Sequence, residues 1–269
     1  MPMVTTRDGT EIYFTDWGSG PPVVLIHGWP LNGDMWQSQA LHLANSGFRV
    51  IAYDRRGFGR SGTPWAGHDY DTFASDLDAL MTSLDLSGAA LVGFSMGGGE
   101  VARYIGRHGT GRVSKAVLMA AVTPFLLKTA DNPEGADASL FEGMIEGITK
   151  DRAQFFRDFA PGFYGPAKVS QGVLDWTLMM AMQASLKGTL DCVRAFGWTD
   201  FRPDLAKFSL PTLVMHGEQD AIVPFAVSGK AAAAMIPGAK LVSYRAAGHG
   251  MTVTHKDQVN VDLLAFLRG

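Results

Sequence analysis

A serine flanked by two glycines stands between a predicted strand and a predicted helix. The residues Gly93-Phe94-Ser95-Met96-Gly97 match G-x-S-x-G, with an apolar run before them and helical spacing after them. A strand, a sharp turn and a helix in that order is the context of a nucleophile elbow. The two glycines leave room for the neighbouring strand and helix. We therefore predict that Ser95 is a nucleophile; the alternative is a glycine-rich turn with an incidental serine.

Serine is a poor nucleophile at neutral pH without a general base, and the chain has seven histidines. On an elbow of this type the chain order is serine, acid, histidine, so the base should follow the last predicted strand. His249 lies there in a glycine-flanked turn, at the strand end where open α/β sheets build their sites. His255 lies further on, and we expect it at the surface. His249 is the predicted base.

The other five histidines are expected to have structural roles. His27 precedes a turn and should brace it, and His216 ends a strand and should support the loop that follows. The remaining three are expected at surface or capping positions: His42, His68 and His108.

The acid is expected in the loop after the strand that ends at His216. That loop, Gly217-Glu218-Gln219-Asp220, contains two carboxylates. Asp220 agrees with chain order and strand-end position, whereas Glu218 lies too early; a turn-forming aspartate is the alternative. Asp220 would hold the imidazole in the correct tautomer and stabilise the imidazolium.

A reaction through an oxyanion needs two convergent backbone N–H donors. One donor is expected from Met96, the residue after the nucleophile, and the other from the loop after the predicted strand 23–26. In that loop, His27-Gly28-Trp29-Pro30, we assign the donor to Trp29, because Pro30 has no N–H.

The elements that must position these residues alternate between short apolar strands and amphipathic helices. A hairpin is predicted around Asp8-Gly9, which is a strong turn signal. Besides the strand before Ser95 and the helix after it, strands are predicted at 23–26, 48–53, 116–122, 212–216 and 241–244, and helices at 32–46, 72–84, 228–235 and 259–268. Alternation of this kind implies right-handed crossovers and a mostly parallel sheet.

The alternation stops between residues 124 and 201. That segment is rich in Phe, Met and Trp, has helical spacing and contains no convincing strand. We predict a helical cap inserted at 124–201 into an α/β core formed by residues 1–123 and 202–269. The alternative is that these helices simply pack on the sheet.

The amino-acid composition is that of a globular protein with a large hydrophobic core. The chain has 269 residues, of which 46% are hydrophobic, so it can bury a large core. A net charge of −3 indicates neither nucleic acid nor an anionic membrane as partner. The single cysteine, Cys192, rules out an internal disulfide and fits a reducing cytosol. Without a signal peptide or a spanning apolar run, a cytoplasmic location is expected.

A second glycine-rich stretch must be weighed as a nucleotide site. The residues Gly57-Phe58-Gly59-Arg60-Ser61-Gly62 fit G-x-G-x-x-G, but the dinucleotide fingerprint must open a helix, and Thr63-Pro64-Trp65 continues a loop. We expect Arg55, Arg56 and Arg60 to form structural ion pairs. No H-E-x-x-H motif occurs, and no metal or cofactor is predicted.

Several segments together resemble the bacterial aryl esterases and cofactor-free haloperoxidases, or perhydrolases, of the α/β-hydrolase fold. The resemblance covers essentially the whole chain and is carried by residues 27–30, 54–61, 93–99, 121–124 and 199–204. It implies an eight-stranded, mostly parallel sheet with the second strand antiparallel, helices on both faces and a small helical cap. It also implies the same triad and the same two oxyanion donors.

By matching positions, the resemblance implies an apolar pocket for the acyl or alcohol group. For each residue the alternative is ordinary core packing. The implied lining is Pro30, Val122, Phe125, Leu126, Phe159, Phe163, Ile222 and Phe225. Members of the family are often trimers or hexamers, so a homo-oligomer is implied. In the family, proline at the position of Pro30 accompanies strong perhydrolysis, and leucine accompanies plain esterase activity.

The resulting hypothesis is a serine carboxyl-ester hydrolase that acts on small aryl or short-chain esters through an acyl-enzyme. Hydrogen peroxide would replace water as a side activity and give a peracid, which oxidises halide in solution without haem or metal. Haloalkane dehalogenases and epoxide hydrolases are disfavoured, because their sites carry Asp where Ser95 stands. A lactamase or other amidase, and a non-catalytic ligand-binding protein of the same fold, stay open.

Overall fold

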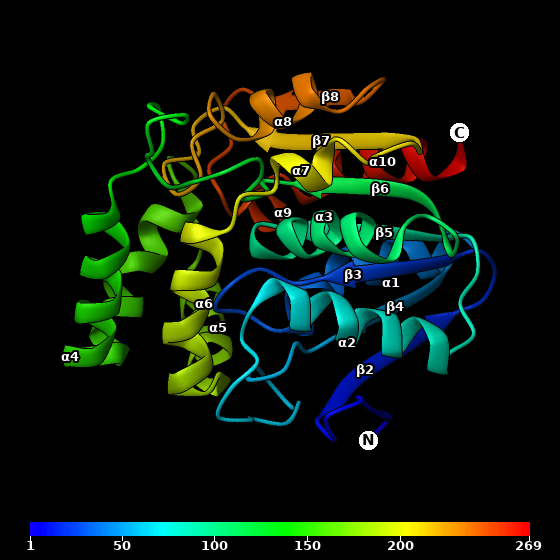
Figure 1. The fold of residues 1–269 in the computed structure, drawn as a ribbon, viewed down its shortest axis with the longest axis horizontal. Coiled ribbons are helices and arrows are strands. Elements are labelled where there is room, and N and C mark those ends of the chain that lie inside the picture. The colour runs from blue at the N-terminus through cyan, green and yellow to red at the C-terminus, as the bar shows by residue number, and fades with distance from the viewer.

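The computed structural model describes residues 1–269 as an eight-stranded sheet with helices on both faces (Figure 1). The strands are β1 (Met3–Thr5), β2 (Glu11–Gly18), β3 (Pro22–Ile26), β4 (Arg49–Tyr53), β5 (Ala89–Phe94), β6 (Val113–Met119), β7 (Thr212–Gly217) and β8 (Lys240–Tyr244). Their order is β1-β2-β4-β3-β5-β6-β7-β8. β2 is antiparallel to both of its neighbours, and all later pairs are parallel. The predicted sheet, including its antiparallel second strand, is confirmed.

The helices follow the strands along the chain. A 3-10 turn, η1 (Gly33–Trp36), precedes the first of them, α1 (Gln37–Asn45). The others are α2 (Tyr70–Ser83), α3 (Met96–His108), α4 (Ala138–Tyr164), α5 (Gln171–Gln183), α6 (Leu186–Trp198), α7 (Arg202–Leu205), α8 (Gly229–Met235), α9 (Met251–Thr254) and α10 (Lys256–Arg268). No helix combines the length and the hydropathy that crossing a membrane requires.

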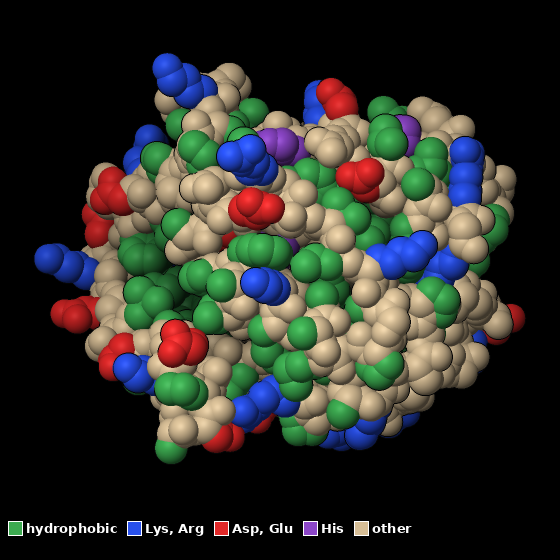
Figure 2. Space-filling model, turned by 90° about the horizontal axis from the view of Figure 1, so that it is seen from above, with side chains coloured by type: hydrophobic (Ala, Val, Ile, Leu, Met, Phe, Trp, Pro, Cys, Tyr) green, Lys and Arg blue, Asp and Glu red, His purple; other side chains and the backbone are tan.

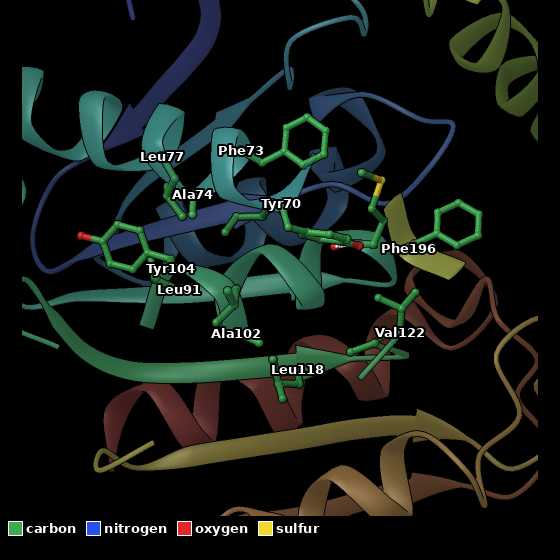
Figure 3. Packing of buried hydrophobic residues seen from close by; sticks show 14 of the residues in the cluster. Tyr70, Phe73, Ala74, Leu77, Leu91, Ala102, Tyr104, Leu118, Val122 and Phe196 are labelled. Atoms are coloured by element: carbon green, nitrogen blue, oxygen red, sulfur yellow. Dashed lines mark hydrogen bonds between the residues drawn. The ribbon is translucent and has the colours of Figure 1, made fainter. Parts of the chain in front are cut away.

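The apolar strands bury both faces of the sheet. Because successive side chains of a strand point to opposite faces, Val24 and Ile26 enter the core under α2 and α3, whereas Val23 and Leu25 enter the core under α1 and α10. A continuous apolar run is what a strand covered on both sides requires. Figure 3 shows side chains of α2 and α3 packed against those of β5 and β6.

Several predicted boundaries differ from the structure, and two of the differences have a clear structural cause. The strand predicted at 116–122 ends at Met119, because Ala120 takes a φ of 46° and turns the chain out of the sheet. The helix predicted at 32–46 begins instead as the 3-10 turn. Its first residues are held by side chains: Asn32 accepts a hydrogen bond from the Asp34 N–H (3.0 Å), and Asp54 accepts one from the Gly33 N–H (2.8 Å).

Three helices, α4 to α6, lie between β6 and β7 in the chain and stand at one end of the sheet (Figure 1, left). That end is where the arrowheads of the parallel strands point. α4 is bent at Asp151, whose backbone is extended and whose side chain caps the second half by accepting the Gln154 N–H (3.0 Å). The helices fall within 124–201; their description as a separate cap with those bounds stays a prediction.

The α2 side of the core yields a prediction about stability. Leu77→Ala removes a side chain that is fully buried, and should lower the free energy of unfolding by about 2–5 kcal/mol. The matched control is Leu41→Ala on α1, where the side chain is 56% exposed and the change should stay within about 0.5 kcal/mol. Urea denaturation measures both. Equal losses would contradict the assigned core.

Candidate active site

Ser95 occupies the junction between β5 and α3. Its backbone has a φ of 53° and a ψ of −118°, a conformation that is strained for a residue with a side chain. A Cβ atom on Gly93 would overlap the backbone of Gly97, and one on Gly97 would overlap the carbonyl oxygen of Ile26. Only glycine at these two positions lets the strand, the turn and the helix approach so closely. The local geometry is that of a nucleophile elbow.

Asp220 and His249 form a buried pair at the ends of β7 and β8. Asp220 Oδ2 lies 2.6 Å from His249 Nδ1, and both side chains are almost completely buried. The other carboxylate oxygen accepts the N–H groups of Ile222 (2.9 Å) and Val223 (2.8 Å). Because a carboxylate accepts, His249 Nδ1 carries the proton, and Nε2 is left to accept one.

The groups around Asp220 stabilise its ionised carboxylate. Burial opposes ionisation, but the electrostatic attraction of the His249 imidazole, with hydrogen bonds from His216 and His249, outweighs it and keeps the pKa of Asp220 well below its usual range. His216 Nε2 lies 3.2 Å from Asp220 Oδ2 and 2.9 Å from the carbonyl oxygen of Val223. His216 therefore supports the acid loop, as its position at the end of β7 predicts.

Ser95 and His249 line the same cavity. The imidazole lies between two aromatic rings, with centroid separations of 4.9 Å to Phe94 and 5.1 Å to Phe163. The Ser95 hydroxyl makes no hydrogen bond with another protein group. Catalytic hydrogen bonds are often long until substrate binds, so the arrangement is compatible with proton transfer from Ser95 to His249.

The loop after β3 lies directly against the nucleophile. A Cβ atom on Gly28 would come within 3.0 Å of Ser95 Cβ, so the next residue, Trp29, is close to the site. Neither the N–H nor the carbonyl oxygen of Trp29 is bonded within the protein. Met96 is the first residue of α3, and its N–H therefore has no acceptor within the helix. These two amides are available as donors to an oxyanion.

The cavity above Ser95 measures about 250 Å³ and is almost wholly apolar. Ser95 and His249 are its two non-hydrophobic lining residues among fifteen. A hollow lined by hydrophobic side chains is visible at the α4–α6 end of the molecule (Figure 2, left). Such a site favours uncharged, apolar groups.

Five of the eight pocket residues expected from sequence line this cavity: Val122, Leu126, Phe159, Phe163 and Ile222. The other three do not. Pro30 lines a small neighbouring cavity behind Phe159 and Phe163. Phe125 is buried, with the Arg202 guanidinium 5.3 Å from its ring centre, and the Phe225 ring lies 5.7 Å from that of His216. Neither ring lines the cavity above Ser95.

The sequence reasoning missed seven lining residues besides the Trp29 side chain: Leu140, Phe141, Met144, Phe155, Phe196, Ala221 and Val223. The two halves of α4 supply six of the fifteen lining residues, more than any other element. Phe155 stands four residues before Phe159, which stands four before Phe163, so one helix face carries all three rings. That spacing is readable in the sequence, whereas the bend that turns both halves of α4 toward the cavity is not.

One histidine prediction is wrong. His68 is not at the surface: its side chain is fully buried against Gly57 and Gly188, and Nδ1 lies 3.3 Å from Asp191 Oδ2. Burial lowers the pKa of His68. The loop after β4 folds back onto α6 and covers the ring, a long-range contact that local sequence does not reveal. His42 and His108 lie in the last turns of α1 and α3.

The arginines near the second glycine-rich stretch are paired within the protein. Arg55 pairs with Glu100, Arg56 with Asp76 and Asp8, and Arg60 with Asp54 and Asp34, and the stretch is a loop. The prediction of structural ion pairs is confirmed. No group of three or more metal-ligating side chains lies close enough together to hold an ion.

Comparisons with known proteins agree with this fold. The sequence profile of the alpha/beta hydrolase fold family matches residues 21–256. The chain is 49% identical to a non-heme chloroperoxidase of Kitasatospora aureofaciens over 99% of each chain, and 44% identical to a bifunctional esterase/perhydrolase of Acinetobacter calcoaceticus over 100% of each. The crystal structure of a bromoperoxidase from Bacillus anthracis matches with a TM-score of 0.97 and 48% identity, covering 100% of this chain and 99% of that one.

The pair behind Ser95 predicts how its reactivity depends on pH. An imidazole must be neutral to accept the serine proton, so an imidazole that is protonated in acid cannot act as the base. Asp220 stays ionised in acid because its pKa is depressed. Protonation of a single group, the imidazole, should therefore govern the loss of Ser95 reactivity at low pH. The rate at which a fluorophosphonate labels Ser95 should therefore fall about tenfold per pH unit in acid. A flat profile to about pH 4, with the fold intact by circular dichroism, would contradict His249 as base.

Proposed function

The chain belongs to the alpha/beta hydrolase fold family, and we propose that it is a serine ester hydrolase with perhydrolase activity. The observation that carries the proposal is the convergence of the strained Ser95 turn and the buried Asp220–His249 pair on one apolar cavity. The chloroperoxidase and the esterase/perhydrolase that are similar over their full lengths support it. The site residues and their roles are part of the proposal.

In the first half of the reaction, Ser95 Oγ attacks the carbonyl carbon of the ester while His249 Nε2 takes the hydroxyl proton. The Trp29 and Met96 N–H groups donate hydrogen bonds to the oxyanion of the tetrahedral intermediate. The carbon–oxygen bond to the alcohol then breaks, and His249 returns its proton to the leaving oxygen. An acyl group remains on Ser95. Asp220 stabilises the imidazolium throughout, because its carboxylate accepts from Nδ1.

In the second half, a small nucleophile cleaves the acyl-enzyme. Water gives the carboxylic acid, and hydrogen peroxide gives the peracid; in both cases His249 takes one proton and returns it to Ser95 Oγ. The peracid leaves the site and oxidises halide in free solution. Oxidation therefore needs no redox group on the protein, which accommodates the haloperoxidase names of the relatives.

The size and chemistry of the cavity support small, uncharged substrates. About 250 Å³ of apolar space suits an aryl group or a short acyl chain, and no charged side chain lines it. We propose acetate to butyrate esters and small aryl esters as the substrate class. Long-chain lipid emulsions should be poor substrates.

The decisive experiment is Ser95→Ala, assayed with p-nitrophenyl esters of increasing chain length and a matched anilide. Loss of the nucleophile should lower kcat about a million-fold, as it does in subtilisin. Ser228→Ala is the control, because that serine is equally buried yet bonds only to backbone carbonyls of residues 223 and 224. Near-normal turnover by purified Ser95→Ala enzyme would end the serine-hydrolase proposal. Faster anilide than ester cleavage would favour an amidase.

The choice between water and peroxide yields a separate prediction. The Trp29 carbonyl oxygen has no partner in the protein and is free to accept a hydrogen bond from a peroxide attacking the acyl-enzyme. Pro30 restricts the backbone of the residue before it. One such bond contributes about 0.5–1.5 kcal/mol, so Pro30→Leu should lower the perhydrolysis-to-hydrolysis ratio about two- to tenfold on one acyl donor. If both rates change equally, Pro30 does not control this choice.

A further inference from the structure

A buried ion pair lies beneath the loop that carries Trp29. Arg55 and Glu100 have side chains that are 1% and 0% exposed, and Arg55 Nε donates to Glu100 Oε2 at 2.7 Å. Tyr53 donates its hydroxyl to the other carboxylate oxygen. None of these residues lines the cavity above Ser95. The steps proposed for ester cleavage do not use them.

Arg55 holds His27 in two ways. Its backbone N–H donates to His27 Nε2 at 2.9 Å, and its Nη2 donates to the His27 carbonyl oxygen at 2.9 Å. Since Nε2 accepts, Nδ1 carries the ring proton and donates to the Gly28 carbonyl oxygen, again at 2.9 Å. Burial and the charge of Arg55 lower the pKa of His27 well below its ordinary value, so the ring stays neutral. The backbone at 27–28 is thereby fixed from both sides.

The cluster joins the two segments that carry the proposed oxyanion donors. His27 stands two residues before Trp29 in the loop after β3. Glu100 stands four residues after Met96, one turn along the same face of α3. One guanidinium therefore bonds both to the loop of the first donor and to the helix of the second. Movement of either segment would break a buried hydrogen bond to a charged group.

Stability alone does not account for this arrangement. Replacing a buried ion pair by apolar residues of similar size is often neutral or stabilising. Arg55 also leaves its Nη1 without a partner although that atom is buried, which is unfavourable. A neighbouring pair, Arg56–Asp76, is equally buried but contacts neither segment. The Arg56–Asp76 pair therefore serves as a comparison, because it is a buried ion pair that does not join the two segments.

We propose that Arg55, Glu100 and His27 are positioning residues that set the separation and direction of the Trp29 and Met96 N–H groups. The inference rests on the proposed function, because acyl transfer to and from Ser95 is the chemistry that forms an oxyanion between the two amides. The oxyanion exists in the tetrahedral state and not in the bound ester. Disturbing the cluster should therefore lower kcat and leave KM nearly unchanged.

The test replaces the pair without leaving a buried unpaired charge, in the double variant Arg55→Met with Glu100→Gln. Glutamine can still accept from the Tyr53 hydroxyl. The matched control is Arg56→Met with Asp76→Asn. We expect the first variant to lose about ten- to a hundredfold in kcat with KM within about twofold, since removing one oxyanion donor outright costs about 10²–10³. The control should keep kcat within about twofold.

A second measurement isolates the oxyanion. An aryl trifluoromethyl ketone forms a tetrahedral adduct with Ser95, whereas the corresponding phenol only fills the apolar cavity. The ketone should bind at least tenfold more weakly to the first variant than to the parent, and the phenol should bind equally to both. Equal weakening of the two ligands would indicate a damaged cavity and would overturn the proposal.

The outcomes separate this inference from the function it rests on. An active Ser95→Ala enzyme refutes ester hydrolysis by Ser95, and the inference with it. If Ser95→Ala is inactive but Arg55→Met/Glu100→Gln retains kcat like its control, the positioning role alone is refuted. Should the double variant fail to fold, Arg55→Lys takes its place, because lysine keeps the charge beside Glu100 but lacks the planar fork that reaches His27 as well. It should show the same fall in kcat, and normal kcat would refute the role.

Discussion

Three backbone segments meet at Ser95 with no space between them for a Cβ atom. Gly28 touches the serine side chain, Gly93 lies against Gly97, and Gly97 lies against the last carbonyl groups of β3. A methyl group at any of these contacts would separate a strand, a helix and a loop that must remain together. The positive φ of Ser95 persists because these neighbours leave its backbone no alternative. The Asp220–His249 pair and the loop that carries Trp29 are arranged around this junction.

The sheet brings the other residues of the site to the junction at Ser95. β5, β7 and β8 are parallel, so the residues that follow them come out at one edge, and Ser95, Asp220 and His249 each follow a different strand. The two apolar cores on either side make the sheet stiff. The buried pairs Arg55–Glu100 and Arg56–Asp76 contribute no residue to the cavity lining. The cavity itself stays apolar, which strengthens the electrostatic effect of the few polar groups that reach it.

The proposed catalytic residues could be predicted from short sequence segments, because each one follows a strand and they occur in a fixed order along the chain. The elbow, the acid loop and the histidine turn each stand at the end of a strand that is recognisable by its apolar residues, so the contact between Asp220 and His249 could be anticipated. The cavity wall was harder. Phe125 and Phe225 are as apolar as Phe159 and Phe163, and nothing local in the sequence indicates that their rings lie beside Arg202 and His216 instead of lining the cavity. The buried site of His68 likewise depends on how a distant loop meets α6.

The bend of α4 at Asp151 has a consequence for how such a protein diversifies. Both halves of that helix contribute side chains to the cavity, from Leu140 to Phe163, whereas the proposed reacting groups follow strands of the sheet. Six of the fifteen lining residues are thus encoded in a stretch of the chain that carries none of the proposed reacting groups. Mutations in the helix can reshape the space for a substrate while the reactive atoms keep their places. In this architecture the range of substrates can therefore change by mutation while the catalytic chemistry is inherited unchanged.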